Sequence, residues 1–257
     1  MFRRGRRAER KKKRISLLSL TDHDTLDGWE EFRAVCEEYS IRPVSGVELS
    51  AKHSKAVHIL GYRIADFEIL NEALRWVRSR RTARNEVIIS RLRDMGLAVT
   101  MEDVAGFAGN VVARPHFARA LVALGYARNY REAFEKFLAR GAPAYAARDG
   151  LSPAECVSVI KNAGGLPVLA HPWLIGLDEE GFGELIISLK THGMWGIECL
   201  SSNCSSEKAL EYLALAEKYS LFPTAGSDFH GSLRPAVSMG VQVTDDLLPW
   251  ARLGVNF

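Results

Sequence analysis

Short apolar runs that end in polar residues recur along this chain, and they alternate with amphipathic stretches. The first run covers residues 15–20 and ends in Asp22-His23-Asp24, and residues 27–39 follow with apolar side chains at helical spacing. A short continuous apolar run is typical of a strand buried on both faces of a parallel sheet. The alternation of such strands with helices predicts an α/β fold with a parallel sheet.

The same pattern predicts five further strands and two further helices. The strands are expected over residues 43–49, 56–62, 166–170, 196–200 and 222–225, and the helices over residues 178–192 and 206–219. From about residue 66 to residue 150 the apolar spacing is helical throughout, which predicts a small helical insert. The expected domains are therefore the two parts of the α/β domain, residues 1–64 and 151–257, and the helical insert, residues 65–150.

The composition is that of a globular protein, because 47% of the 257 residues are hydrophobic and 25% are charged. No apolar run reaches the roughly 18–20 residues of a membrane span, and no apolar segment follows the N-terminal charges as in a secretory signal. The four cysteines are scattered without a CxxC pair, which fits a reducing compartment. We therefore expect a cytoplasmic protein that does not bind a membrane.

The basic residues are concentrated at the N-terminus. Residues 1–14 hold nine Lys/Arg and one Glu, whereas the rest of the chain holds 25 basic and 30 acidic residues. Such a run can bind nucleic acid. A solvated helix face or a frayed end is the simpler interpretation of the same run, and both interpretations stay open.

Histidine, aspartate and glutamate gather at the ends of the expected strands. These residues are His23, Glu48, His58, His171, Asp228 and His230. In α/β barrels the working residues lie at strand ends, and imidazole together with carboxylate suits Mn, Fe or Zn. Each residue alone is also explained as a hydrogen-bonded structural histidine, a turn cap or a salt-bridge partner. The joint pattern favours a metal site, which would activate water and hold a phosphoryl oxygen.

Six motifs, in this order, resemble the PHP (polymerase and histidinol phosphatase) superfamily. They are Leu20-Thr21-Asp22-His23-Asp24-Thr25, Gly46-Val47-Glu48, His58-Ile59-Leu60-Gly61-Tyr62, Ala113-Arg114-Pro115-His116, Ala170-His171-Pro172 and Gly226-Ser227-Asp228-Phe229-His230-Gly231. The resemblance runs from about residue 7 to about residue 240. The insert with its Arg-Pro-His motif is most similar to the bacterial branch of 3',5'-nucleoside bisphosphate phosphatases and RNase AM.

The resemblance implies a distorted (β/α)7 barrel with a centre of up to three divalent metal ions. The implied ligands form three groups. His23 and His230 correspond to ligands of one metal, His58 and His171 to ligands of a second, and Asp228 to a ligand of the third. Glu48 corresponds to the bridging carboxylate. The cofactor expected from the resemblance is Mn²⁺, with Fe²⁺, Zn²⁺ and Mg²⁺ as alternatives.

The resemblance also implies residues that act on the substrate. Arg114 and His116 of the insert correspond to catalytic residues that face the substrate phosphate, and Asp24 is expected to bind substrate. The chemistry agrees for Arg114, since a guanidinium group binds phosphate through two parallel hydrogen bonds. Without the resemblance, Arg114 would be interpreted as a surface residue at the start of a helix.

One part of the superfamily pattern is not present in this sequence. The pattern begins with a strand that ends in His-x-His, and here no histidine precedes His23. The resemblance therefore predicts an N-terminally incomplete barrel with an unpaired edge, in which only the site of Glu48, His58 and His171 is complete. The two explanations are a truncated or mis-started form of an active enzyme, and a natural variant with a degenerate metal centre.

Two functions are expected as alternatives. The first is a metal-dependent phosphoesterase that uses metal-activated water on a phosphomonoester of a nucleotide, of the 3',5'-bisphosphate type, or on the 5' end of short RNA. Its partner is the nucleotide or short oligonucleotide substrate, and no obligate protein partner is expected. The second is a PHP-like protein with an impaired metal centre that binds nucleotide or RNA. In that case residues 1–14 assist, and binding should weaken steeply as salt rises.

Overall fold

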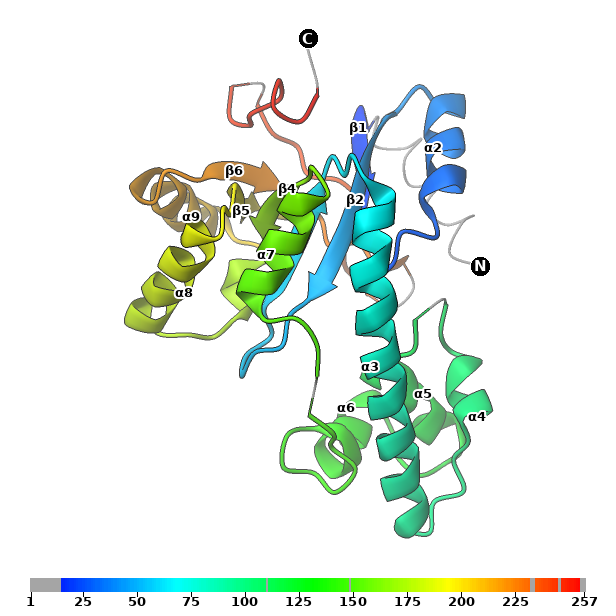
Figure 1. The fold of residues 1–257 in the computed structure, drawn as a ribbon. Coiled ribbons are helices and arrows are strands. Elements are labelled where there is room, and N and C mark those ends of the chain that lie inside the picture. The colour runs from blue at the N-terminus through cyan, green and yellow to red at the C-terminus, as the bar shows by residue number, and fades with distance from the viewer. Residues whose placement is uncertain (1–14, 110, 148, 232–233, 245, 255–257) are drawn as a thin grey trace. The chain divides into compact units, whose positions relative to one another are not determined.

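The computed structural model describes residues 15–109, 111–147, 149–231, 234–244 and 246–254, so the basic run of residues 1–14 lies outside the described residues. The chain divides into two compact units. One comprises Met1–Asn71 with Leu151–Phe257, and the other is Glu72–Gly150 (Figure 1). None of the helices in the described ranges is both long and apolar enough to cross a membrane.

The first unit is built on one six-stranded sheet in the order β1-β2-β3-β4-β5-β6, curled into a half-barrel. The strands are β1 (Leu17–Leu20), β2 (Arg42–Ser50), β3 (His58–Tyr62), β4 (Leu166–Leu169), β5 (Gly196–Leu200) and β6 (Phe222–Ala225). All six lie where the apolar runs predicted them, to within two residues at either end. The described part of the chain thus has six strands, where the resemblance implies a (β/α)7 barrel.

The prediction of a wholly parallel sheet was wrong for one strand. Strand β3 is antiparallel to both β2 and β4, whereas the β1–β2, β4–β5 and β5–β6 pairs are parallel. The reason is the connection: residues 51–57 between β2 and β3 are too few for the crossover of a dozen or more residues that parallel strands need. As a result, the first residue of β3, His58, lies at the same edge as the last residue of β2, Ser50.

Four helices of this unit flank the sheet. They are α2 (Trp29–Glu38), α7 (Pro153–Asn162), α8 (Glu179–Thr191) and α9 (Ser206–Lys218), and α7 to α9 lie beside the β4–β6 part of the sheet (Figure 1). The periodicity predicted three of them. It missed α7, although Ser152 and Glu155 form a reciprocal capping box at its start.

The second unit is helical in its described residues. It contains most of α3 (Phe67–Asp94), then α4 (Met101–Ala105), α5 (Arg114–Ala123), α6 (Tyr130–Ala133) and a π-helical turn, Phe134–Leu138. Among its described residues no strand occurs. The unit has its own core, centred on the fully buried Phe117, Leu121 and Leu92.

Candidate metal centre

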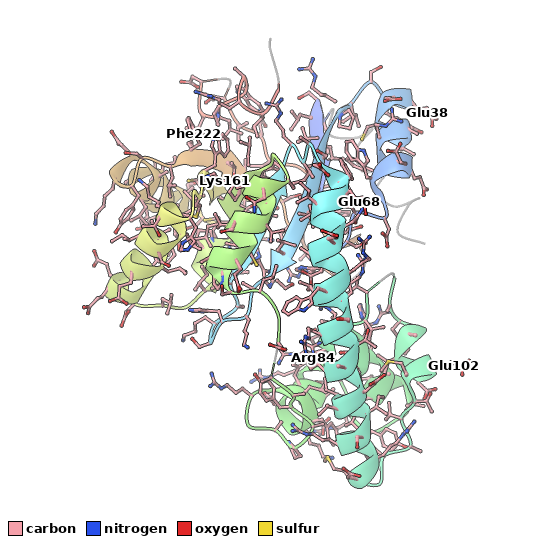
Figure 2. The ribbon with its side chains drawn as sticks, viewed as in Figure 1. Glu38, Glu68, Arg84, Glu102, Lys161 and Phe222 are labelled. Atoms are coloured by element: carbon pink, nitrogen blue, oxygen red, sulfur yellow. The ribbon has the colours of Figure 1, made fainter. Side chains whose placement is uncertain are left out.

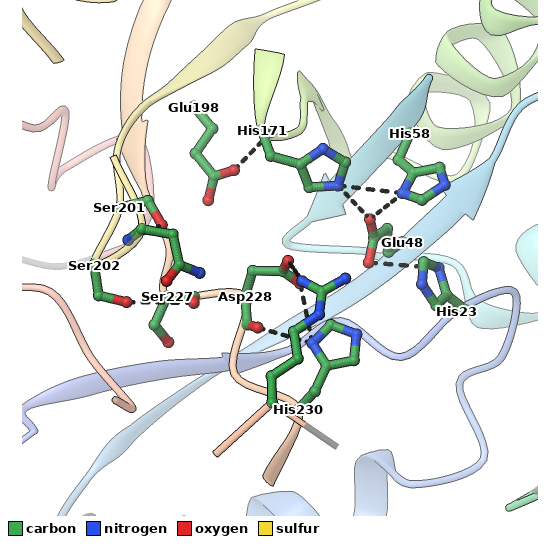
Figure 3. Close-up of polar contacts among 12 residues, drawn as sticks. His23, Glu48, His58, His171, Glu198, Ser201, Ser202, Ser227, Asp228 and His230 are labelled. Carbon is green, nitrogen blue, oxygen red and sulfur yellow. Dashed lines mark hydrogen bonds and ion pairs between the residues drawn. The ribbon is translucent and has the colours of Figure 1, made fainter. Parts of the chain in front are cut away.

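A single buried carboxylate, that of Glu48, is the centre of a histidine cluster at one edge of the sheet (Figure 3). Glu48 Oε1 lies 2.7 Å from His58 Nδ1 and 3.0 Å from His171 Nε2. The two imidazole nitrogens lie 3.2 Å from each other. Residues from β2, β3 and the segment after β4 thus bring one oxygen and two nitrogens into a compact triangle.

His23 approaches the second oxygen of the same carboxylate. Its Nδ1 lies 3.5 Å from Glu48 Oε2 and 3.3 Å from Ser50 Oγ. An isolated parallel bridge between His23 and Glu48 continues the β1–β2 pairing beyond the end of β1. The neighbouring Asp24 is fully buried, and its Oδ1 accepts a hydrogen bond from the Ser50 backbone N–H at 2.9 Å. Asp24 therefore anchors the loop that carries His23.

His171 is held in an unusual backbone conformation by a residue that the sequence pattern did not single out. Its φ angle of 28° lies in the left-handed region, and its backbone N–H donates to Glu198 Oε2 at 2.7 Å. Glu198 is buried in β5, and burial raises its pKa to about 8. Its position inside a strand, rather than at a strand end, concealed it in the sequence.

Gly226 makes room for this carboxylate. A Cβ atom at position 226 would lie 2.2 Å from Glu198 Oε1. Replacing Gly226 by Ala is therefore expected to displace Glu198, to release the His171 backbone, and to lower the free energy of unfolding by about 1–3 kcal/mol. Urea unfolding and metal content per chain measure the two effects.

The matched control for that substitution is Gly109→Ala, because a Cβ atom at position 109 has no heavy atom within 4 Å. This variant should unfold and bind metal as the unchanged chain does. Equal behaviour of the two variants would contradict the role given to Gly226.

Asp228 and His230 follow β6 and form the other side of the cluster. The His230 ring centroid lies 6.3 Å from that of His23. His230 Nδ1 contacts the Asp228 backbone oxygen at 2.8 Å and Asp228 Oδ1 at 3.2 Å. Arg234 forms an ion pair with Asp228 Oδ2. The six ligands expected from the sequence thus all belong to this unit, and the partner Arg234 was not expected.

The electrostatics keep the central carboxylate ionised. Burial alone would raise the pKa of Glu48, but the surrounding His23, His58 and His171 hold this pKa well below its usual range. Burial likewise opposes the charged form of His171, yet Glu48 and the nearby Glu198 and Asp228 together raise the pKa of His171. The cluster therefore combines an anionic oxygen with imidazole nitrogens, which is a donor set for a divalent cation.

The geometry fits such a cation. With bonds of about 2.1 Å, neighbouring ligand atoms of one metal lie about 3.0–3.4 Å apart, close to the three separations around Glu48 Oε1. Ligand atoms of His23, Glu48 and His58 also lie within 4.8 Å of one another.

Arg114 and His116 belong to the helical unit and are described there alone. The Arg114 guanidinium lies 5.6 Å from the centre of the Tyr145 ring. His116 Nδ1 accepts a hydrogen bond from the Ala113 backbone N–H at 3.0 Å. Burial, together with the charges of Arg119 and Arg81, lowers the pKa of His116. The lowered pKa favours the neutral imidazole, whose proton is on Nε2 because Nδ1 accepts a hydrogen bond.

Comparison with known proteins agrees with this geometry. No protein-family model matches the chain. The chain is 32% identical over 241 residues to a 3',5'-nucleoside bisphosphate phosphatase of Chromobacterium violaceum, an alignment that covers 92% of this chain and 84% of the relative. It is 31% identical over 225 residues to the 5'-3' exoribonuclease Rnm of Escherichia coli, covering 84% of this chain and 76% of the relative.

A solved structure is similar over nearly the whole fold. It is an amidohydrolase from Chromobacterium violaceum with bound sulfate and no metal, with a TM-score of 0.86 and 29% sequence identity. The match covers 96% of this chain and 89% of that one. The relatives, together with the histidine–carboxylate cluster at the edge of the sheet, identify the chain as a hydrolase. With these relatives, the chain belongs to the PHP-like metal-dependent phosphoesterases.

Proposed function

We propose that this phosphoesterase acts on a nucleotide, as a phosphatase of the 3',5'-bisphosphate type or at the 5' end of short RNA. The observation that carries the proposal is the buried Glu48 carboxylate with His58 and His171 converging on one oxygen. The names of two relatives, a nucleoside bisphosphate phosphatase and a 5'-3' exoribonuclease, support the substrate class.

The cluster of Glu48, His58 and His171, extended by His23, Asp228 and His230, would hold divalent cations, with Mn²⁺ as the proposed ion. Bound there, such ions would supply an activated water and would offset charge on the phosphoryl oxygens. Glu198 positions His171 through the backbone hydrogen bond.

Arg114 and His116 are proposed to act on the phosphate from the helical unit. The Arg114 guanidinium has five N–H donors, and a bidentate contact with phosphate uses two of them. The Nε2–H of neutral His116 can donate a hydrogen bond, or a proton, to a phosphate oxygen. The positive charges of Arg119 and Arg81 near His116 favour binding of the same phosphate.

The proposal predicts that His171→Ala removes phosphate release, because the variant loses the imidazole nitrogen that converges on Glu48 Oε1. Release from adenosine 3',5'-bisphosphate should fall by at least about 100-fold. A 5'-phosphorylated oligoribonucleotide, assayed in parallel for released mononucleotide, distinguishes the phosphatase from the exonuclease. His192→Ala, at an exposed histidine on the α8 C-cap, is the control and should keep full activity. Undiminished release by His171→Ala would refute the assignment.

A further inference from the structure

Two carboxylates of the candidate metal centre have different kinds of partner. The partners of Glu48 are three imidazoles, those of His23, His58 and His171. Asp228 Oδ2 instead accepts a hydrogen bond from the guanidinium of Arg234. An imidazole that loses its proton offers a lone pair and becomes a metal ligand, whereas a guanidinium stays protonated and has no lone pair to offer. The two carboxylates are therefore not equally open to a divalent cation.

Arg234 reaches Asp228 from a turn that follows β6. Its backbone N–H donates to the Gly231 backbone oxygen at 3.3 Å, and its backbone oxygen accepts from the Val237 N–H at 3.0 Å. In the part of the chain that the structure describes, Asp228 is the one acidic residue that forms an ion pair with Arg234. The Arg234 side chain is 47% exposed and that of Asp228 is 14% exposed. The guanidinium can therefore move into water with little loss of buried contact, whereas Asp228 stays at the cluster.

The other oxygen of Asp228 faces the histidine side of the centre (Figure 3). Asp228 Oδ1 lies 3.2 Å from His230 Nδ1. Burial, together with the charges of Glu48 and Asp228, raises the pKa of the neighbouring Glu198. Asp228 thus shares one electric field with the carboxylate on which the histidines converge. A positive charge held on Asp228 acts on the whole centre.

The guanidinium of Arg234 and a divalent cation make the same demand on Asp228, namely its negative charge. A cation on Asp228 either replaces the guanidinium or stays beside it. In the first case the ion pair is lost, and in the second case two like charges share one carboxylate, so both cases lower the affinity for the cation. A hydrogen bond that orients a ligand can raise metal affinity. The orientation of Asp228 does not depend on Arg234 alone, however, because His230 Nδ1 contacts both its Oδ1 and its backbone oxygen.

We propose that Arg234 competes with a divalent cation for Asp228, so that the centre has a high-affinity metal position at Glu48 and a low-affinity position at Asp228. Arg234 thereby sets how many metal ions the chain holds at a given metal concentration. The inference rests on the proposed function, since that assigns Asp228 as a metal ligand. It adds to that function a residue that opposes metal binding at one position and leaves the other position open.

The test measures the binding of Mn²⁺ alone to the full chain by calorimetry, and the number of bound ions per chain by elemental mass spectrometry. Arg234→Gln removes the charge and keeps a polar side chain. Arg234→Lys keeps the charge. Lys161→Gln is the matched control, because it removes one positive charge from an exposed position in the last turn of α7, in the same unit (Figure 2).

Lys161 lies away from the candidate metal centre. Its Nζ is next to Gly193, where a Cβ atom would approach it to 2.8 Å. Gly193 precedes β5, whereas His171 and Asp228 follow β4 and β6. Because β4, β5 and β6 are parallel, the start of β5 and the ends of β4 and β6 lie at opposite edges of the sheet. The charge of Lys161 is therefore remote from the cluster.

Arg234→Gln is expected to lower the Kd of the weaker class of Mn²⁺ positions by at least about tenfold, or about 1.4 kcal/mol. The Kd of the tighter class should change less than about twofold. Arg234→Lys should stay within about threefold of the unchanged chain, because it keeps the charge, and Lys161→Gln should change neither class. A misfolded variant loses affinity, so damage to the fold cannot imitate the expected gain.

Two further measurements show whether the effect acts through Asp228. In a chain that carries Asp228→Asn, the additional change Arg234→Gln should alter the Kd less than about twofold, because the shared carboxylate is gone. In the chain with Arg234→Gln alone, the Mn²⁺ concentration for half-maximal phosphate release from adenosine 3',5'-bisphosphate should fall about tenfold.

Unchanged or weaker Mn²⁺ binding by Arg234→Gln overturns the proposal, and so does an equal gain in Arg234→Lys or Lys161→Gln. Failure of the proposed function gives a different result: Arg234→Gln strengthens Mn²⁺ binding, but the chain releases neither phosphate nor mononucleotide. If the inference alone fails, phosphate is released and its dependence on Mn²⁺ does not change with Arg234. A lack of Mn²⁺ binding by the unchanged chain and by every variant overturns both.

Discussion

Replacement of Glu48 by Gln is expected to remove both bound metal and phosphate release. Gln keeps the shape of the side chain but loses the charge that His23, His58 and His171 surround. Since the buried carboxylate is the shared partner of three imidazoles, its loss affects every one of them. We expect activity to fall by at least about 100-fold and the metal content per chain to fall with it, measured by elemental mass spectrometry.

The control for this substitution is Glu30→Gln, which removes the same charge from an exposed helix position where Glu30 pairs with Arg33. It should leave metal content and activity unchanged, because exposed ion pairs contribute little. If the Glu48→Gln chain retains its full complement of metal, then the cluster around Glu48 is not the metal site.

Replacement of Phe117 by Ala is expected to lower the free energy of unfolding by about 3–5 kcal/mol. Phe117 is fully buried in the core of the helical unit, and Ala leaves a cavity there. Because all six expected metal ligands belong to the other unit, the metal content of the folded variant should not change. Urea unfolding and elemental mass spectrometry measure the two quantities.

Val87→Ala is the matched control for this loss of core packing. Val87 is 42% exposed on α3, so its truncation should change the free energy of unfolding by less than about 0.5 kcal/mol. A loss of metal from Phe117→Ala, with Val87→Ala unaffected, would mean that the metal cluster depends on the packing of the helical unit.

The positions of the strands and the choice of candidate ligands could be predicted from the sequence because both are local properties. A short apolar run shows that a segment is buried, and the polar residues at its end are next to it in the chain. Glu48 and His171 were chosen as candidate ligands in this way, although they are 123 positions apart. The family was recognised for the same reason, since its motifs are short and occur in a fixed order.

Strand direction and the supporting contacts could not be predicted in this way. Hydrophobicity is the same for either direction of a strand, so the antiparallel β3 was missed, although its short connection could have indicated it. Glu198 looks like any charged residue within a strand, and its partner His171 lies 27 positions earlier. Arg234 follows Asp228 by six positions and belongs to no motif, so nothing local indicated their ion pair.

The sequence by itself determined which segments are strands and helices, which histidines and carboxylates stand at strand ends, and to which family the motifs are similar. Only the tertiary structure decided that His58 and His171 meet on one oxygen of Glu48, that Gly226 leaves space for Glu198, and that Arg234 pairs with Asp228. The physical reason is that periodicity and composition depend on neighbours in the chain. Ligand geometry depends instead on how distant segments pair across the sheet, which follows from sheet curvature and chain direction.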